Sequence, residues 1–158
     1  MQTDFNSQAG MEAMLAEACR TIRSHGENTI NGKFAGELLS CDFDEMSSTE
    51  AFDMPEWMKN EYGAIHGGAT AAAFDNAMGV LAWFMDGGRN TQTMSLQISY
   101  MREGRIGQRL IVRSRVTKRG KNVMYLSADA WNEDAPDELT ATADGVFHVS
   151  QERSEDYV

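Results

Sequence analysis

The spacing of hydrophobic residues predicts a helix near the start of the chain. Between residues 7 and 24, apolar side chains recur at steps of three and four, the period of one face of an α-helix. Asn6 or Ser7 stands where an N-cap is expected. We therefore expect an amphipathic helix over 7–24 that packs its apolar face on a core. That face consists of Met11, Met14, Leu15, Ala18, Cys19 and Ile22.

A second helix is predicted over residues 66–84, and it is apolar on nearly every side. From residue 69 onward its only strongly polar residues are Thr70, Asp75 and Asn76. A membrane span is disfavoured because Asp75 would cost about 2.5–3.5 kcal/mol at the centre of a bilayer. A buried helix in a soluble protein is the better interpretation. Such a helix must be covered on nearly all sides, either by a strongly curved sheet or with the help of a second subunit.

After this helix the hydrophobic period changes to two, which predicts strands. In the first of them, Met94 and Leu96 share one face with Ile98 and Tyr100, and Thr93 lies on the other face. A turn at Gly120 joins the second and third strands as a hairpin. Because the connections are short, we expect the four strands to form a meander of antiparallel neighbours. The expected strands cover 92–101, 109–118, 123–131 and 139–150.

Two further strands are expected before the buried helix, within an acidic stretch of the chain. They cover 34–43 and, more weakly, 49–54, where Pro55 ends the second. Together these elements predict one α+β domain over residues 1–158, with one antiparallel sheet of five to six strands and a helix against it. The length of 158 residues is typical of a single domain, and the apolar fraction of 42% is sufficient for one core.

Composition narrows the class of protein further. Two cysteines, Cys19 and Cys41, without CxxC spacing favour free thiols over a disulfide framework. The first ten residues lack the features of an export signal, so we expect a cytoplasmic protein. The net charge of −10 argues against nucleic acid as a partner. Residues 102–121 nevertheless carry eight positive charges against one negative, which fits either solvated strand faces or a site for a small polyanion such as a phosphorylated cofactor.

Two polar features around the buried helix point to chemistry. His66 is followed by two glycines just where the helix begins, and unpaired N–H groups at a helix N-terminus can polarise a carbonyl or hold an oxyanion. Asp75 lies inside the helix with no cationic residue three or four positions away. A desolvated carboxylate without a charge partner is a candidate base or nucleophile, although a structural bond to a hydroxyl of Thr91, Thr93 or Ser95 is an alternative.

Helical geometry separates these two features. In a regular helix, His66 and Asp75 lie about 13.5 Å apart along the axis and about 180° apart around it. They therefore cannot meet at one reacting atom within one chain. Two copies of the helix lying side by side in opposite directions would bring them together, which predicts a two-fold dimer with active sites at its interface.

The segment NEYGAIHGGATAAAFDNAMG, residues 60–79, resembles the signature of the hotdog-fold acyl-CoA thioesterases. The similarity is to the branch that contains the phenylacetate-pathway and 4-hydroxybenzoyl-CoA types and the human-type enzymes for medium-to-long chains. It runs from about Asn60 to Val149. The resemblance implies a curved antiparallel sheet wrapped around one long helix, with dimers that often pair into tetramers. It implies hydrolysis of an acyl-CoA to the free acid and CoA, with no separate cofactor.

By position, the resemblance also implies roles for individual residues. Asp75 activates water or attacks the thioester, and Thr93 positions the water. The N–H of Gly67, or of Gly68, holds the thioester carbonyl from the other subunit. Asn60 orients the carbonyl or the water. His66 shapes the Gly-Gly turn, near the sulfur. Four basic residues are candidates for the CoA phosphates, or equally surface charges: Arg89, Lys118, Arg119 and Lys121.

Other functions fit the sequence less well. A hotdog hydratase or dehydratase and a non-catalytic acyl-CoA-binding protein stay open as alternatives. A metal hydrolase is disfavoured because the chain has only His25, His66 and His148 and lacks an HExxH motif. A serine hydrolase is disfavoured by the lack of a GxSxG motif. The acyl group itself is not readable from the sequence.

Overall fold

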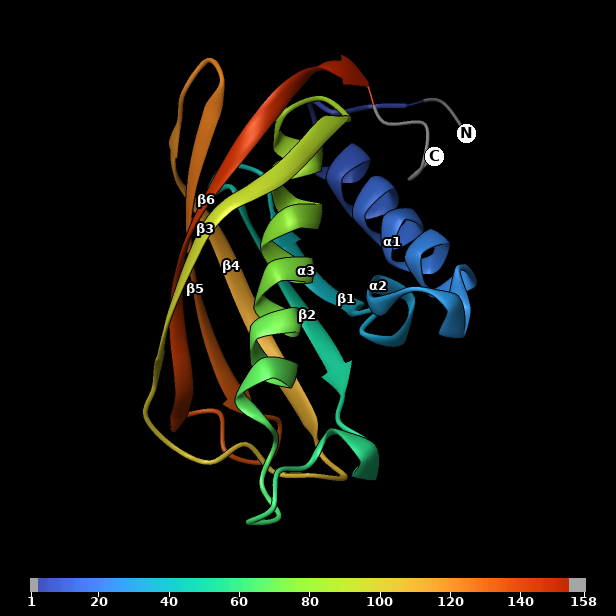
Figure 1. The fold of residues 1–158 in the computed structure, drawn as a ribbon. Coiled ribbons are helices and arrows are strands. Elements are labelled where there is room, and N and C mark those ends of the chain that lie inside the picture. The colour runs from blue at the N-terminus through green and yellow to red at the C-terminus, as the bar shows by residue number, and fades with distance from the viewer. Residues whose placement is uncertain (1–2, 154–158) are drawn as a thin grey trace.

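A computed structural model describes residues 3–153. A six-stranded antiparallel sheet curves around the long helix α3, Gly67–Met85, and the helix α1, Gln8–Ser24, packs on the side that the sheet leaves open (Figure 1). The strands are β1 Glu37–Asp42, β2 Ser47–Asp53, β3 Arg89–Tyr100, β4 Arg109–Arg119, β5 Val123–Asn132 and β6 Leu139–Arg153. Three short helices complete the chain: η1 Gly26–Asn28, α2 Ile30–Lys33 and η2 Glu56–Met58. The expected α+β fold is confirmed.

Both predicted helices form nearly where the hydrophobic period places them. The Ser7 side chain caps α1 by accepting from the Gly10 N–H at 3.0 Å, and the six predicted apolar positions are buried. The helix α3 begins after His66 and ends at Asp86, where Gly87 and Gly88 adopt positive φ angles of 71° and 80°. Glycine adopts these angles without strain, so the chain can turn sharply into β3.

The strand order corrects the predicted meander. The order across the sheet is β1-β2-β4-β5-β6-β3, so β4, β5 and β6 are consecutive neighbours but β3 pairs with the last strand, from Thr91 opposite Val149 to Tyr100 opposite Ala141. The β4 strand pairs instead with β2 on its other side. The physical reason is coverage of α3. The crossover leaves β5 and β6 between β3 and β4, so that β3 lies at the edge of the sheet and both β3 and β4 pack on the helix.

A β-bulge in β3 corrects the predicted faces of that strand. Thr93 pairs with Phe147 and Ser95 with Val146, so Met94 is an extra residue without a partner in the register. One extra residue reverses the alternation of side chains. Thr93 therefore points to the same side as Leu96, toward α3, and not to the opposite side as a strict period of two predicted.

The described residues include no helix that is long and apolar enough to cross a membrane. Cys19 is buried and Cys41 is partly buried, and both are free thiols.

Candidate functional site

Asp75 lies half-buried on α3 and is held by one strand hydroxyl. The Thr93 Oγ1 donates to Asp75 Oδ1 at 2.6 Å, which ties the centre of the helix to β3. One of the two carboxylate oxygens is thereby fixed in direction, and the bulge described above is what turns Thr93 toward it. The bond from Thr93 is the one expected if Asp75 has a structural role. The same bond would also orient the carboxylate toward a ligand.

A small cavity of about 90 Å³ opens beside this pair. Its polar wall is formed by Asp75, Asn76, Thr91, Thr93 and Asn31. Its apolar wall is formed by Ile22, Gly79, Val80 and Phe147. The carboxylate of Asp75 therefore faces a small cavity that is partly open to the surface.

The loop that precedes α3 is folded around Asn60. The Asn60 Oδ1 accepts from the backbone N–H of Tyr62 at 2.9 Å and from that of Ala64 at 3.1 Å. The backbone N–H of Asn60 donates to the Ala64 carbonyl at 2.8 Å. These bonds leave the Nδ2 amino group of Asn60 as the part of the side chain that is available to a ligand.

His66 caps α3 directly. Its Nδ1 accepts from the Gly68 N–H at 2.9 Å. Within the described part of the chain, the neighbouring Gly67 N–H makes no hydrogen bond. The Tyr100 hydroxyl donates to the carbonyl of Gly67 at 2.8 Å. Burial raises the pKa of Tyr100, so this hydroxyl stays protonated. The helix start thus presents one free N–H, at Gly67.

Within one chain the two parts of the candidate site stay apart. None of Asn60, His66, Gly67 and Gly68 lines the cavity beside Asp75. At 1.5 Å per residue, Gly67 and Asp75 are about 12 Å apart along α3. The predicted separation of the N-terminal donor from the carboxylate therefore agrees with the geometry of the single chain.

One face of α3 is left uncovered by the sheet and by α1. Thirteen of its nineteen residues are buried, and the remaining six lie on one side of the helix within about 140° of arc. Five of them are glycine or alanine, and the sixth is Asp75. They are Gly67, Gly68, Ala71, Ala72, Asp75 and Gly79. Small side chains allow another backbone to approach this face closely.

Two of the four basic candidates for CoA binding are engaged in ion pairs. The Arg89 Nε lies 2.6 Å from Asp86 Oδ2, and an Arg119 amino group lies 3.5 Å from Asp86 Oδ1. Asp86 is buried at the C-terminal end of α3, where the helix dipole disfavours a negative charge. Two arginines near this carboxylate offset that cost, so a structural role accounts for their positions.

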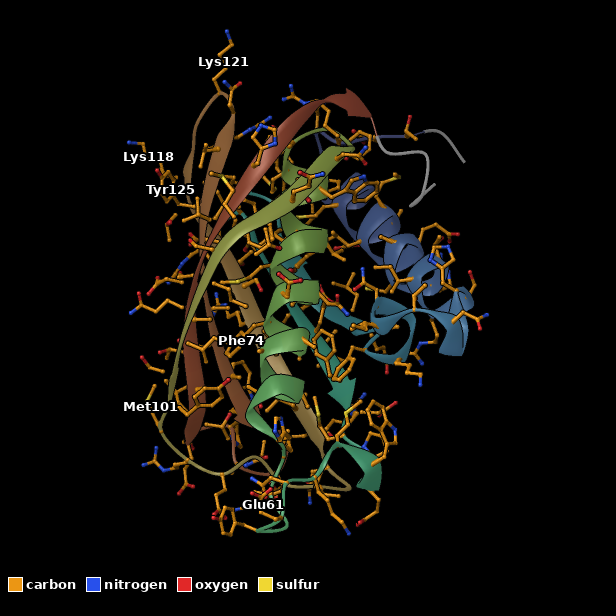
Figure 2. All side chains as sticks on the ribbon, viewed as in Figure 1. Glu61, Phe74, Met101, Lys118, Lys121 and Tyr125 are labelled. Carbon is orange, nitrogen blue, oxygen red and sulfur yellow. The ribbon has the colours of Figure 1, made fainter. Side chains whose placement is uncertain are left out.

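Lys118 and Lys121 remain exposed, and Figure 2 shows both pointing outward at the β4–β5 end of the molecule, away from α3. Glu61 marks the Asn60 loop at the opposite end of the molecule (Figure 2). Elsewhere the basic stretch is partly neutralised, since Arg105 pairs with Asp134 at 2.6 Å and Arg109 pairs with Glu133. The Glu133 carboxylate raises the pKa of Arg109 and its own pKa is lowered in return.

Among the residues that the structure describes, no three His, Cys, Asp or Glu side chains come together as a group able to hold a metal ion.

The curved sheet around one long helix, with a capped glycine turn at the helix start and a carboxylate within the helix, defines a hotdog-type protein. The sequence profile of the thioesterase superfamily matches residues 62–138, the segment that carries these features. This match covers just under half of the chain and relates that part of it to the thioesterase superfamily.

Among curated relatives, acyl-coenzyme A thioesterase 13 of Mus musculus is 27% identical over 74 residues, which are 47% of this chain and 53% of the relative. The human protein of the same name is 28% identical over the same length. The chain thus spans about half the length of the curated relatives it matches.

Solved structures show the same fold at low identity. Thioesterase superfamily member 2 from Mus musculus has a TM-score of 0.73 at 21% identity, with 89% of this chain and 98% of that chain covered. A phenylacetic acid degradation-related protein from Ralstonia eutropha JMP134 has a TM-score of 0.69 at 24% identity, covering 82% and 98%. A Streptococcus mutans UA159 protein bound to acetyl CoA has a TM-score of 0.66 at 19% identity, covering 75% and 91%.

Sequence reasoning missed three contributors to this region. Ile22 and Asn31 line the cavity although they precede the matched segment, and Tyr100 bonds to Gly67 from a strand. No local pattern marks them, because they reach the site only through the packing of α1 and the register of β3. The one available signal was the position of Ile22 on the apolar face of the first helix.

Proposed function

We propose that the protein hydrolyses an acyl-CoA thioester to a free acid and CoA. The observation that carries this proposal is the Asp75 carboxylate, oriented by Thr93 at 2.6 Å and facing a cavity. The match of residues 62–138 to the thioesterase superfamily supports the same reaction. So does the name of the curated relatives, acyl-coenzyme A thioesterase 13.

In the proposed reaction Asp75 acts on the carbonyl carbon through water. The carboxylate accepts a proton from water as the water oxygen bonds to the carbonyl carbon, and Thr93 holds the carboxylate in place. The C–S bond then breaks, and the CoA thiolate leaves and takes up a proton. A thiolate is a good leaving group because the pKa of a thiol is only about 8.5. In the alternative route the carboxylate attacks the carbon itself, and water then hydrolyses the resulting anhydride.

The carbonyl oxygen needs a donor as negative charge develops on it, and Gly67 supplies the best candidate. Its N–H is unbonded among the described residues and lies at the positive end of the α3 dipole. The Gly68 N–H is the weaker candidate because it already donates to His66. The Asn60 Nδ2 lies in the same loop system and orients the carbonyl or the water.

A two-fold dimer would complete the site. The uncovered face of α3 carries Asp75 at one end and Gly67 at the other, with Ala71 and Ala72 between them. Two such faces packed in opposite directions about an axis near Ala71 would place each Asp75 beside the Gly67 of the partner. The long edge strand β3, where Met94 is 60% exposed, flanks this face and would be covered with it.

The exposed Lys118 and Lys121 are the remaining candidates to meet CoA phosphates. They lie at the opposite end of the molecule from the Asn60 loop (Figure 2), so opposed helices would bring them toward the loop of the partner. Pairing of such dimers into a tetramer, and a cytoplasmic location, belong to the same proposal.

The test is release of free thiol from acyl-CoA by the purified protein and by Asp75→Ala. Release by the wild type and its loss in the variant are expected. A hydratase or dehydratase would instead change the absorbance of an enoyl thioester without releasing thiol. A non-catalytic binding protein would do neither, and either of these two results would reject the proposed hydrolysis.

A further inference from the structure

The cavity beside Asp75 is bordered on one side by a part of the chain that lies outside the segment matched by the family. Ile22, on α1, and Asn31, on α2, line the same space as Asp75 and Thr93. The family match begins only at residue 62. The N-terminal segment therefore contributes a wall that the matched segment does not supply.

This wall is anchored to α3 next to the carboxylate. The Asn76 Nδ2, on the residue after Asp75, donates to the Phe34 carbonyl at 2.8 Å. The Thr29 hydroxyl caps α2 by accepting from the Gly32 N–H at 2.9 Å. Ile22 is only 4% exposed, so its side chain is fixed by the core of the protein. A ligand in the cavity would thus meet a preformed boundary.

The free amide in this wall belongs to Asn31. Its side chain is exposed at the cavity and makes no hydrogen bond with the described residues. Ile22 lies on the apolar side of the same space. The wall therefore has an apolar part, formed by Ile22, and a polar part, formed by Asn31.

The volume of the cavity limits what can lie next to a carbonyl attacked by Asp75. An apolar cavity of about 150 Å³ accommodates benzene, which has six carbons. The present cavity of about 90 Å³ is smaller, and in proportion it has room for about three or four heavy atoms. An aromatic ring or a medium-length chain exceeds this space and would have to displace Asn31 or extend beyond it.

We propose that Ile22 and Asn31 are the specificity-determining residues of this site and restrict it to short acyl thioesters, with acyl groups of about two to four carbons. This inference rests on the proposed function, since it assigns the acyl end of the same pocket. Ile22 acts as the stop for the acyl chain, and Asn31 narrows the opening beside it.

The experiment compares kcat/KM for acetyl-, butyryl-, hexanoyl-, octanoyl- and phenylacetyl-CoA. The wild type should prefer acetyl- or butyryl-CoA over octanoyl- and phenylacetyl-CoA by at least about tenfold, the scale on which one surplus methylene is discriminated in a closed pocket. Ile22→Ala should raise the ratio of hexanoyl- to butyryl-CoA by about tenfold. Asn31→Ala should shift this ratio in the same direction. Asn31→Phe should lower kcat/KM for butyryl-CoA relative to that for acetyl-CoA.

Asn28→Ala is the matched control, because Asn28 is an exposed asparagine of the same segment that does not line the cavity. Because Ile22 is buried, the two Asn31 variants keep the test decisive if Ile22→Ala does not fold. Wild-type preference for octanoyl- or phenylacetyl-CoA would overturn the inference. So would Asn31 variants that change KM equally for every thioester, which would place the pantetheine arm in the cavity. Failure of these five thioesters and of palmitoyl-CoA to release thiol would overturn the proposed function itself, which distinguishes the two results.

Discussion

At the residue scale, the site depends on one carboxylate whose direction is set by one hydroxyl. Asp75 occupies a helix-interior position, where aspartate is a poor helix former, and nothing in its own helix pairs with it. The Thr93 hydroxyl supplies the partner from across the helix–sheet interface. A substitution can therefore remove the charge of Asp75 and still keep its hydrogen bond with Thr93.

Asp75→Asn should lower kcat by about 10²–10⁴-fold, because the amide keeps an oxygen for Thr93 but cannot act as a base. The thermal unfolding midpoint should stay within a few degrees of the wild type. Thiol-release kinetics and a melting curve measure the two effects. Asp144→Asn, an exposed carboxylate on β6, is the control and should leave kcat unchanged. Normal turnover in Asp75→Asn would remove Asp75 from the mechanism.

A second carboxylate, Glu50 on β2, is buried away from the site and should control the pH dependence of stability. It is 1% exposed, and its nearest hydrogen-bonding neighbour is the Cys19 thiol, 3.8 Å away. Burial raises the pKa of Glu50 to about 8. Burial also raises the pKa of Cys19, so its thiol stays protonated and brings no positive charge to offset a charged Glu50.

The raised pKa of Glu50 determines the direction in which the free energy of unfolding changes with pH. Between the unfolded value of 4.5 and about 8, the folded protein holds a proton on Glu50 that the unfolded chain releases. The free energy of unfolding should therefore fall by about 1.4 kcal/mol per pH unit as pH rises through this window, relative to Glu50→Gln, which cannot ionise. Urea unfolding at pH 5, 6, 7 and 8 measures the difference. Parallel curves for wild type and variant would contradict the assigned proton.

At the element scale, the loop before α3 has two roles, one in folding and one in meeting a ligand. Asn60 takes part in both. Asn60 folds the loop through its Oδ1, and these bonds do not engage its Nδ2. His66 then caps the helix and occupies the Gly68 N–H, which leaves Gly67 as the donor. The loop thus both shapes the helix start and presents groups to a ligand.

Substitution of Asn60 can separate these two roles. Asn60→Ala should lower kcat by about 10²–10³-fold, the usual loss for one donor to an oxyanion. Asn60→Asp keeps an oxygen that accepts from Tyr62 and Ala64 but lacks the amino group. If the Nδ2 donor is what matters, both variants should lose kcat to a similar extent while Asn60→Asp keeps wild-type stability. An active Asn60→Asp would instead assign Asn60 to loop structure alone.

At the scale of the whole molecule, the uncovered face of α3 predicts shared active sites. Each complete site would combine Asp75 from one subunit with Asn60 and Gly67 from the other. Two inactive variants, Asp75→Asn and Asn60→Ala, should therefore complement each other when unfolded together and refolded as a mixture. Half of the dimers would be mixed and each would hold one intact site, so about a quarter of wild-type activity is expected.

The measurement is thiol release by the refolded mixture, compared with each variant refolded alone. Sedimentation of the wild type should show a dimer or a larger even-numbered assembly. A mixture no more active than its parts, or a monomeric active enzyme, would locate the whole site within one chain.

The local patterns of the sequence determined the elements of this protein. The periods of three to four and of two placed α1, α3 and the strands, because side chains that share a face must repeat with the period of the backbone. The segment 60–79 also indicated the family. These are properties of residues near one another in the chain, and local spacing is sufficient to specify them.

Only the tertiary structure decided which groups meet. The place of β3 beside β6, the bulge at Met94 and the approach of Asn31 to Asp75 each depend on residues far apart in the sequence. A single bulge moved Thr93 from one face of the sheet to the other, against the simple alternation of its strand. Contacts of this kind arise from the packing of distant segments around the apolar faces of α3, and no local period records that packing.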